Sequence, residues 1–444
     1  MIPQAQREMS VSSLEAVPEW SPLTRIGFRF AFSYFLLYAG AGVVGSLGSY
    51  KKFKTVDARL LDKIWHPLVN WVGVHIFHLT GSLTEVPNGS GDELYDYVLI
   101  PCLVAIAILA TIIWSSLDRN RRSYCKLYAW LRLFMRLLVG WAMLGYGVKK
   151  LIGAQFTPPT LAKLLESIGR QTPMGMLWTF MGSSQAYSFF GGFGETLGGV
   201  LLIIPGITAL GALVSLAMMS NVLMLNLCYD VPRKIFSIHL VLMCLFLLLP
   251  EVRRLTNVFI LNRTAYPVSE TPLFRDKLMN RVAVVFQIAF GAYVLLIAGQ
   301  QSFRDRHDLL LTLPAQIRGV WAVQGFVVDG IPELPNVTGS ERWQHVIFDR
   351  PDLLTIQSMD GEQTDFLMRI DEGLKTAELR KSEDPLWKAK FTLEYPRQNR
   401  VLLQGQFGSH KVTANLERKN ISDPDQFPLA NRSFHWVDPA IDSR

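Results

Sequence analysis

Long apolar stretches, several of them without any charge, separate an apolar N-terminal part of the chain from a more polar C-terminal part. Seven stretches before residue 303 are long enough, or nearly so, to cross a hydrocarbon core of about 30 Å as helices. The predicted crossings are Phe30–Tyr50, Tyr97–Leu117, Tyr128–Ile152, Ala186–Ile204, Thr208–Leu227, Ile235–Pro250 and Val282–Phe303. Cores of soluble proteins rarely repeat charge-free runs of this length. The pattern therefore predicts an α-helical polytopic membrane protein with about seven transmembrane helices.

The segment Ile64–Leu79 does not fit the same pattern. It is short, and its polar load is heavy for lipid: His66, Pro67, Asn70, His75 and His78. An interfacial or re-entrant helix suits it better than a crossing, but a crossing stays open as the alternative.

The period of the pattern changes between residues 318 and 418. Short runs rich in β-branched and aromatic residues follow one another there, separated by turn residues such as those at Asp360-Gly361 and Gly408-Ser409. The eight predicted strands are Val320–Phe326, His345–Phe348, Leu353–Ile356, Phe366–Ile370, Lys375–Leu379, Ala389–Tyr395, Val401–Phe407 and Lys411–Glu417. Eight strands on short turns predict an antiparallel up-and-down β-barrel. Such a barrel either holds one small apolar ligand or is filled by its own side chains, and both readings stay open.

Together these patterns predict five segments. They are an N-terminal tail (1–22), accessory transmembrane helices with an external interfacial segment (23–127), a four-helix membrane bundle (128–262), a cytoplasmic loop with the last transmembrane helix (263–303), and an external β-barrel with its tail (304–444).

Charge sharpens this division. The 444 residues are 50% hydrophobic and 18% charged, with a net charge of +7, and the mean hydropathy is +0.22. Residues 1–301 hold 26 Lys and Arg against 16 Asp and Glu, whereas residues 302–444 hold 18 against 21. The basic excess thus belongs to the membrane part, where it indicates topology, so nucleic acid is not an expected partner.

The basic residues orient the predicted helices. The loops Asp118–Lys126 and Glu251–Arg281 are the most basic and are expected to be cytoplasmic. Counting crossings from them places residues 153–185 and the C-terminal barrel on the external side. The basic cluster Lys51–Lys63 is the one feature that this topology leaves unexplained.

One ionisable residue interrupts the apolar run from Gln171 to Tyr229, and it is Glu195. An acidic group in the middle of a span is expected to face the bundle interior and a partner. The predicted topology brings a polar cluster into the outer half of the bundle: Tyr146, Lys149, Glu195, Asn221, Asn226 and His239. The cluster is either a pocket that passes protons during redox chemistry of a quinone, or a set of structural contacts between helices in which Lys149 and Glu195 form an ion pair.

No further motif points to other chemistry. The four cysteines form no C-x-x-C pair, and only Cys228 is placed for external thiol chemistry, with an ordinary buried cysteine as the other reading. His75 and His78 alone do not complete a metal site, so no metal is expected. The sequence contains no catalytic triad, P-loop, kinase or metalloprotease signature.

The stretch from Arg132 to Leu261 resembles the DoxX family of bacterial membrane proteins. The resemblance rests on Lys149-Lys150, on Gly194-Glu195-Thr196-Leu197-Gly198-Gly199, on Leu201-Leu202 and on Pro205-Gly206-Ile207-Thr208-Ala209. It implies a four-helix bundle. Some members of the family are quinone-reducing subunits in thiosulfate oxidation, and others join membrane complexes with redox enzymes. Further along, Gly319-Val320-Trp321 and Arg418 resemble the first strand of lipocalin-type barrels and the basic residue that covers its tryptophan.

The sequence therefore favours a DoxX-like protein of the bacterial inner membrane. Its expected role is that of a membrane subunit of a quinone-linked redox system, either non-catalytic or interacting with quinone, with the lipid bilayer and a redox partner enzyme as partners. The external barrel would bind a ligand or a partner. The alternative is a non-enzymatic module in which the barrel captures a lipid or small molecule and the helices anchor it.

Overall fold

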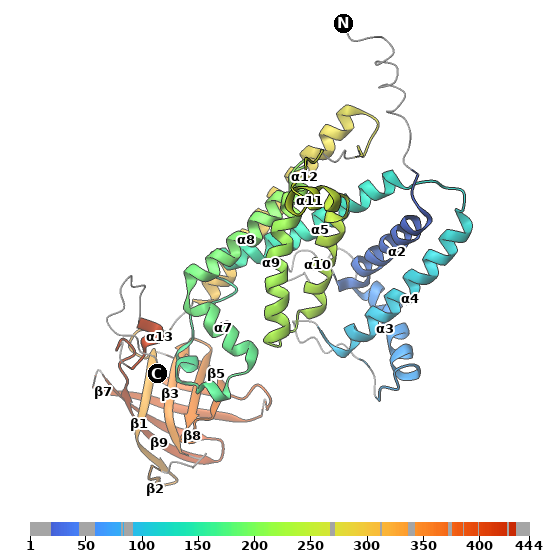
Figure 1. Cartoon of the computed structure of the whole chain (residues 1–444). Helices are drawn as coiled ribbons and strands as arrows, with labels where there is room; N and C mark the ends of the chain where they lie inside the picture. Colours follow the sequence, from blue (N-terminus) through green and yellow to red (C-terminus); the bar gives the residue numbers. More distant parts are fainter. Residues whose placement is uncertain are drawn as a thin grey trace, which may run out of the picture. The chain divides into compact units, whose positions relative to one another are not determined.

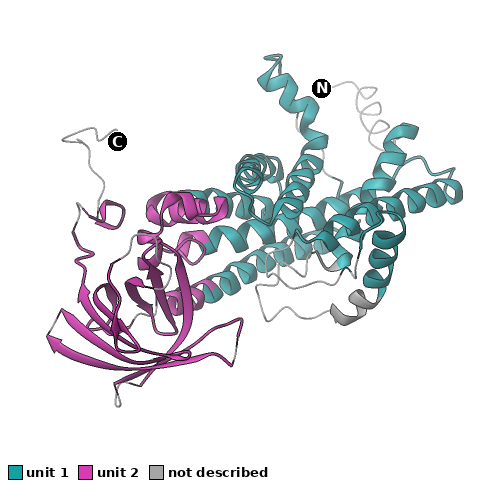
Figure 2. Ribbon diagram, turned by 90° about the horizontal axis from the view of Figure 1, so that it is seen from below, with its two compact units in different colours: residues 1–149, 191–301 teal, residues 150–190, 302–444 magenta. Residues whose placement is uncertain are grey.

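The computed structural model describes most of the chain, and its residues form two compact units (Figure 2). The described residues are 19–43, 58–80, 83, 92–266, 271–310, 313–335, 342–371, 375–384, 386–397, 399–423 and 426–431. The first unit, here the helical unit, comprises residues 1–149 and 191–301, and the second, the barrel unit, comprises residues 150–190 and 302–444. The cluster Lys51–Lys54 lies outside the described residues, and Arg59 and Lys63 fall in the first turns of a helix.

Helices make up the first part of the chain (Figure 1). They are α2 (Pro22–Tyr38), the π-helix η1 (Ala39–Val43), α3 (Ala58–His75), α4 (Leu94–Leu117), α5 (Cys125–Ile152), α8 (Gln185–Ile203), α9 (Thr208–Cys228), α10 (Lys234–Leu248), the 3-10 turn η4 (Leu249–Glu251), α11 (Val252–Phe259) and α12 (Lys277–Leu309). Within the described residues, six helical stretches are long and apolar enough to cross a membrane: α4, α5, α8, α9, α10 with α11, and α12. The prediction of a multi-pass helical membrane protein is confirmed.

The first predicted crossing, Phe30–Tyr50, is not one of these six. Residues 44–50 of its charge-free run lie outside the described residues, and the helix that holds the earlier part begins before the run does. That run starts at Phe30, whereas α2 starts at Pro22, where the Ser21 hydroxyl accepts a hydrogen bond from the backbone of Thr24. The helix includes Arg29, whose guanidinium donates to the Tyr124 hydroxyl, the Ser115 hydroxyl and the Asp118 carbonyl. These acceptors offset the cost of burying the charge, and they come from residues some 90 positions away.

The ambiguous segment Ile64–Leu79 falls on α3 and on the residues just after it. Helix α2 begins beside the 118–124 loop, because the Trp20 amide donates to the Arg122 carbonyl at 3.1 Å, and α4 ends at that loop. The two helices pack together, so the end of α2 and the start of α4 lie at the opposite face of the unit, where His66 of α3 stacks on Tyr95 at 4.8 Å. A lone helix that leaves and returns at one face does not cross, which supports the interfacial interpretation.

Glycines allow α8 to approach both of its neighbours closely. A Cβ placed on Gly147 of α5 would lie 2.7 Å from the backbone nitrogen of Thr196, and one on Gly198 would lie 2.6 Å from the Ser215 hydroxyl of α9. Small residues at these positions allow the helix backbones to approach closely. At the end of α8, the buried Arg136 of α5 donates to the carbonyl of Leu202 at 3.0 Å and satisfies a helix-terminal acceptor.

The predicted barrel is confirmed as a closed antiparallel sheet. Its strands are β1 (Gly319–Val328), β3 (Trp343–Arg350), β4 (Leu353–Ser358), β5 (Gln363–Asp371), β6 (Thr376–Arg380), β7 (Lys388–Arg397), β8 (Arg400–Phe407) and β9 (His410–Arg418), with the two-residue β2 (Ile331–Pro332) added at the β1 edge. Pairing of β1 with β9, from Trp321 opposite Arg418 to Val328 opposite Val412, closes the ring. Alternate residues face inward, as Ala389, Phe391 and Leu393 do on β7.

The start of the barrel has the contacts that its sequence predicts. The indole nitrogen of the fully buried Trp321 donates to the Ile317 carbonyl at 2.8 Å, and the Arg418 guanidinium lies over the indole ring, 5.2 Å from its centroid. Arg418 also donates to the carbonyls of Ala315 and Arg318. Gly319 has a φ of +155°, and Arg418 packs where its side chain would be.

The segment that joins α5 to α8 packs on the outside of the barrel. It contains α6 (Leu161–Leu165), the 3-10 turn η3 (Ile168–Arg170) and α7 (Pro173–Ser183). Leu161 packs with Val320 and Ile347, and its amide donates to the Asp349 carboxylate at 2.9 Å. The buried His345 and Gln357 share a hydrogen bond of 2.9 Å, and the Gln357 amide donates to the Leu165 carbonyl at 3.3 Å. The barrel wall and this segment therefore fold as one unit.

Candidate functional site

A buried histidine with both ring nitrogens hydrogen-bonded lies in α10. The Nδ1 atom of His239 is 2.7 Å from the Ile235 carbonyl, which can only accept, so this nitrogen carries the proton. The Nε2 atom is 2.7 Å from the Tyr34 hydroxyl. In the neutral ring this nitrogen accepts a hydrogen bond from that hydroxyl. His239 is 4% exposed. The result is an imidazole joined to a phenol by a short hydrogen bond within the helical unit.

A second tyrosine, Tyr38, stacks on the histidine of this hydrogen-bonded pair. The ring of Tyr38 is parallel to that of His239, with 3.7 Å between centroids and 4° between planes. Tyr38 is 1% exposed, yet its hydroxyl has no hydrogen-bond partner among the described residues. Leaving such a group unpaired costs about 1–3 kcal/mol, and unsatisfied groups of this kind often mark functional sites. The charges of Asp92, Asp96 and Arg233 act on this hydroxyl.

Two helices and a loop hold the tyrosines and the histidine in place. Tyr34 and Tyr38 are one turn apart on α2, so both rings face α10. The α10 helix is fixed at its start by Asp92, whose carboxylate accepts from the amides of Lys234 and Ile235. A carboxylate at this position also complements the positive end of the helix dipole.

Asn226 and Asn221 of the predicted cluster have different surroundings. The Asn226 amide donates to the Arg233 carbonyl at 3.3 Å and to the Ser237 hydroxyl at 3.2 Å, so it braces the turn between α9 and α10. Asn221 is exposed on α9. Of these two α9 residues, only Asn226 forms hydrogen bonds with the start of α10, the helix that carries His239.

The remaining members of the predicted cluster belong to α5 and α8. Glu195 is 2% exposed, and the charges of Glu195 and Arg233 both act on the Tyr146 hydroxyl. Lys149 is half-buried one turn further along α5. Tyr146 and Glu195 thus lie within electrostatic range of each other, while an ion pair between Lys149 and Glu195 stays a prediction.

The two residues that touch His239, Tyr34 and Tyr38, are not among the predicted site residues. They precede the predicted bundle by about 90 residues, whereas partners of His239 were expected among the helices after Tyr128. Their spacing of four in an apolar helix was the available signal, because it places two hydroxyls on one face.

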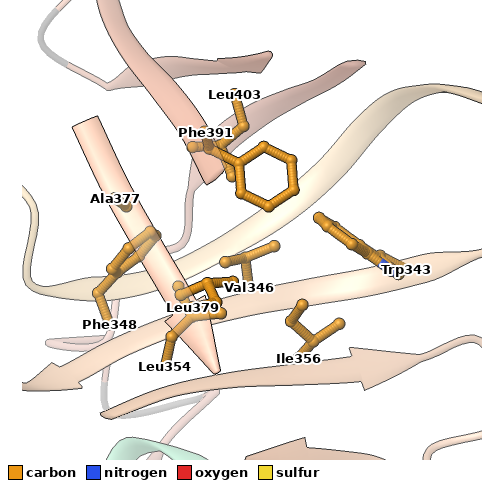
Figure 3. Close-up of a pocket in the computed structure, with 9 residues that line it drawn as sticks. All are labelled: Trp343, Val346, Phe348, Leu354, Ile356, Ala377, Leu379, Phe391 and Leu403. Carbon is orange, nitrogen blue, oxygen red and sulfur yellow. The ribbon is translucent and has the colours of Figure 1, made fainter. Parts of the chain in front are cut away.

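The barrel lumen is the second place where the sequence predicts a binding site. Figure 3 shows nine apolar side chains from β3, β4, β6, β7 and β8 that converge there, and they leave a cavity of about 10 Å³. That volume is at the lower limit for a single water molecule. Aromatic contacts fill the lumen further, since the centroid of the Trp343 ring lies 5.0 Å from the ring centroids of both Phe326 and Phe407. Of the two readings, the structure favours a barrel filled by its own side chains.

The histidines and cysteines of the described residues can be placed individually. No group of three or more His, Cys, Asp or Glu side chains is placed to hold a metal ion within the part of the chain that the structure describes. All four cysteines are free thiols there; Cys102 and Cys244 are buried, Cys125 is half-buried and Cys228 is exposed.

Comparison with known proteins identifies a relative but no activity. An uncharacterized protein of Bacillus subtilis (strain 168), YwoB, is 35% identical over 124 residues, which are 28% of this chain and 79% of YwoB. The chain belongs to the YwoB family. The name YwoB carries no function, and the match covers little more than a quarter of the chain. No protein-family model matches the sequence, and no solved structure matches it.

Proposed function

We propose that this protein is a membrane subunit of a quinone-linked redox system. The observation that carries the proposal is the 2.7 Å hydrogen bond between the Tyr34 hydroxyl and Nε2 of His239, buried under the ring of Tyr38. Reduction of a quinone to a quinol takes up two protons with two electrons, and His and Tyr side chains are suited to hand over protons. The electrons would come from a redox partner enzyme.

The proposed site binds the carrier by its oxygens. A quinone carbonyl would replace Nε2 of His239 as the acceptor of the Tyr34 hydroxyl, and the unpaired hydroxyl of Tyr38 offers a second donor. Glu195 and Tyr146, which lie within electrostatic range of each other, would accept and return protons from the neighbouring helices. The resemblance of residues 132–261 to the DoxX family supports this reading, since quinone-reducing subunits occur in that family.

Charge supports one orientation in the bacterial inner membrane. Arg119, Arg121 and Arg122 follow α4, and Arg253 and Arg254 follow α10, so by the positive-inside rule these two loops are cytoplasmic. The start of α10, with the His239 site, and the lipocalin-like barrel are then external.

The barrel in this proposal binds a protein partner. Its filled lumen counts against the alternative in which it carries a lipid or small molecule. Apolar side chains at the end of β1 and β2 are instead open to a partner, with Ile331 at 67% and Leu334 at 79% exposure.

Quinone binding by the purified protein tests the proposal. The full chain in mild detergent is titrated with a short-chain quinone and labelled with a photoreactive analogue. Tyr34→Phe and His239→Gln should each weaken binding roughly three- to tenfold, the contribution of one neutral hydrogen bond. Asn221→Ala, at an exposed position of α9, serves as the control and should change nothing. The proposal fails if the wild-type protein binds no quinone, or if folded Tyr34, His239 and Glu195→Gln variants all bind it normally.

A further inference from the structure

The short helix α11 has the amphipathic pattern of a helix that lies in a membrane surface. On a helical wheel its apolar residues Val252, Leu255, Val258 and Phe259 occupy one side. The other side carries Arg253, Arg254, Thr256 and Asn257. None of its residues is buried. On the apolar side only the half-buried Leu255 packs against the core of the helical unit, whereas Val252, Val258 and Phe259 are exposed.

The direction of α11 differs from that of the helix before it. The 3-10 turn η4, which contains Pro250, ends α10, because proline cannot continue an α-helical hydrogen-bond ladder. Figure 1 shows α11 nearly end-on where α10 is seen from the side, so α11 runs across the end of α10. If α10 crosses the bilayer, α11 lies along its surface.

Apolar side chains continue past the helix and are open. Phe259 is 76% and Ile260 75% exposed, and Leu261 follows them. Large side chains exposed together at the end of a membrane helix indicate a surface that is covered in the membrane. The apolar side of α11 is continuous with the apolar end of α10, where Leu249 is also exposed.

The charge beside this apolar surface is positive. Residues 251–281 contain six Lys and Arg but three Asp and Glu. Arg254 pairs with Glu251 at 3.3 Å, whereas no hydrogen bond or ion pair joins the side chains of Arg253 and Arg263 to other described residues. Basic side chains next to a membrane-embedded apolar face attract anionic lipid headgroups.

We propose that residues Val252–Arg263 form an in-plane amphipathic anchor that binds anionic phospholipids at the end of α10. This α11 anchor would fix the depth and rotation of the helix that carries His239. It does not depend on the chemistry proposed for that site.

Lipid retention by the full-length protein tests the charged side of the α11 anchor. The protein is released from detergent into a mass spectrometer with added phosphatidylglycerol or with phosphatidylcholine of the same acyl chains. Phosphatidylglycerol should be retained preferentially. The double variant Arg253→Gln/Arg254→Gln should weaken its binding about fivefold per arginine. Arg397→Gln/Arg400→Gln, on exposed barrel residues, lowers the charge equally and should not change retention.

Spin labels test the apolar side in nanodiscs that contain phosphatidylglycerol. In a Cys228→Ser background, a label at Phe259→Cys should be accessible to oxygen and protected from a water-soluble nickel reagent. A label at Asn257→Cys, on the other side of α11, should show the reverse. Equal nickel access at both positions, or equal retention of the two lipids, would overturn the proposal and favour a protein partner or a second copy of the chain.

Discussion

The two units of this protein differ in where they bury polar side chains. The helical unit buries ionisable side chains among apolar helices, among them Arg29, Arg136, Glu195 and His239. The barrel unit keeps its lumen apolar, and buries His345 and Gln357 where α6 packs on the barrel wall. Helices crossing a bilayer bury such groups at a high cost, so those that remain mark function or a specific contact.

This difference bears on where the proposed redox site lies. The lumen of the barrel is filled by packing and contributes stability. In the helical unit Arg29 and Arg136 satisfy backbone or side-chain acceptors and are structural, whereas the hydroxyl of Tyr38 is left without a partner beside His239. The chemistry is therefore expected in the helices and the structural support in the barrel.

The largest expected loss of stability comes from a substitution that disrupts the packing inside the barrel. Trp343→Ala should destabilise it by about 3–5 kcal/mol, since a large buried ring would leave a cavity among Phe326, Phe391 and Phe407. Hydrogen exchange of the full chain should show the loss as faster exchange in β3 to β9. Leu367→Ala, at a half-exposed position of β5, should change stability by less than about 0.5 kcal/mol. Unchanged protection in Trp343→Ala would mean that the lumen is not the stabilising core.

A smaller effect is expected where the helices meet. Gly147→Ala should cost about 1–3 kcal/mol, because its methyl group would lie 2.7 Å from the backbone nitrogen of Thr196. Gly191→Ala on α8 meets no atom within 4 Å and should be neutral or slightly stabilising. Thermal unfolding of both variants in the same detergent separates them. Equal melting temperatures would contradict the close approach of α5 and α8.

The smallest expected effect is a pH dependence at the wall of the barrel. Burial lowers the pKa of His345 below its usual value, and the positive charge of Lys419 adds to this, although the bond to Gln357 opposes it. The unfolded chain therefore binds the proton more readily. Stability is complete above the usual value of about 6.5 and falls as the pH drops from there through the lowered pKa.

Hydrogen exchange in α6, β3 and β4, compared between about pH 7.5 and 5.5 after correction for intrinsic rates, measures this loss. His345→Gln keeps a hydrogen-bonding side chain that does not titrate, so its protection should no longer depend on pH in this range. A pH dependence that persists in this variant would assign the effect to another group.

Some elements of the fold were predicted from the sequence, and others were not. The eight strands were predicted within a few residues, because inward and outward positions alternate and turn residues separate them. The start of α2 was missed because a charge normally ends a membrane span, and only Tyr124, Ser115 and Asp118 explain why Arg29 is buried.

By itself, the sequence predicted a membrane part of about seven apolar helices, of which six long apolar stretches are found among the described residues, a closed barrel after them, and a polar cluster that includes Glu195 and His239. These follow from periodicity and charge, which depend on near neighbours along the chain. The tertiary structure alone decided that Tyr34 and Tyr38 contact His239 and that the lumen is filled. Each of these depends on side chains far apart in sequence whose distance is set by packing, and no local pattern encodes that distance.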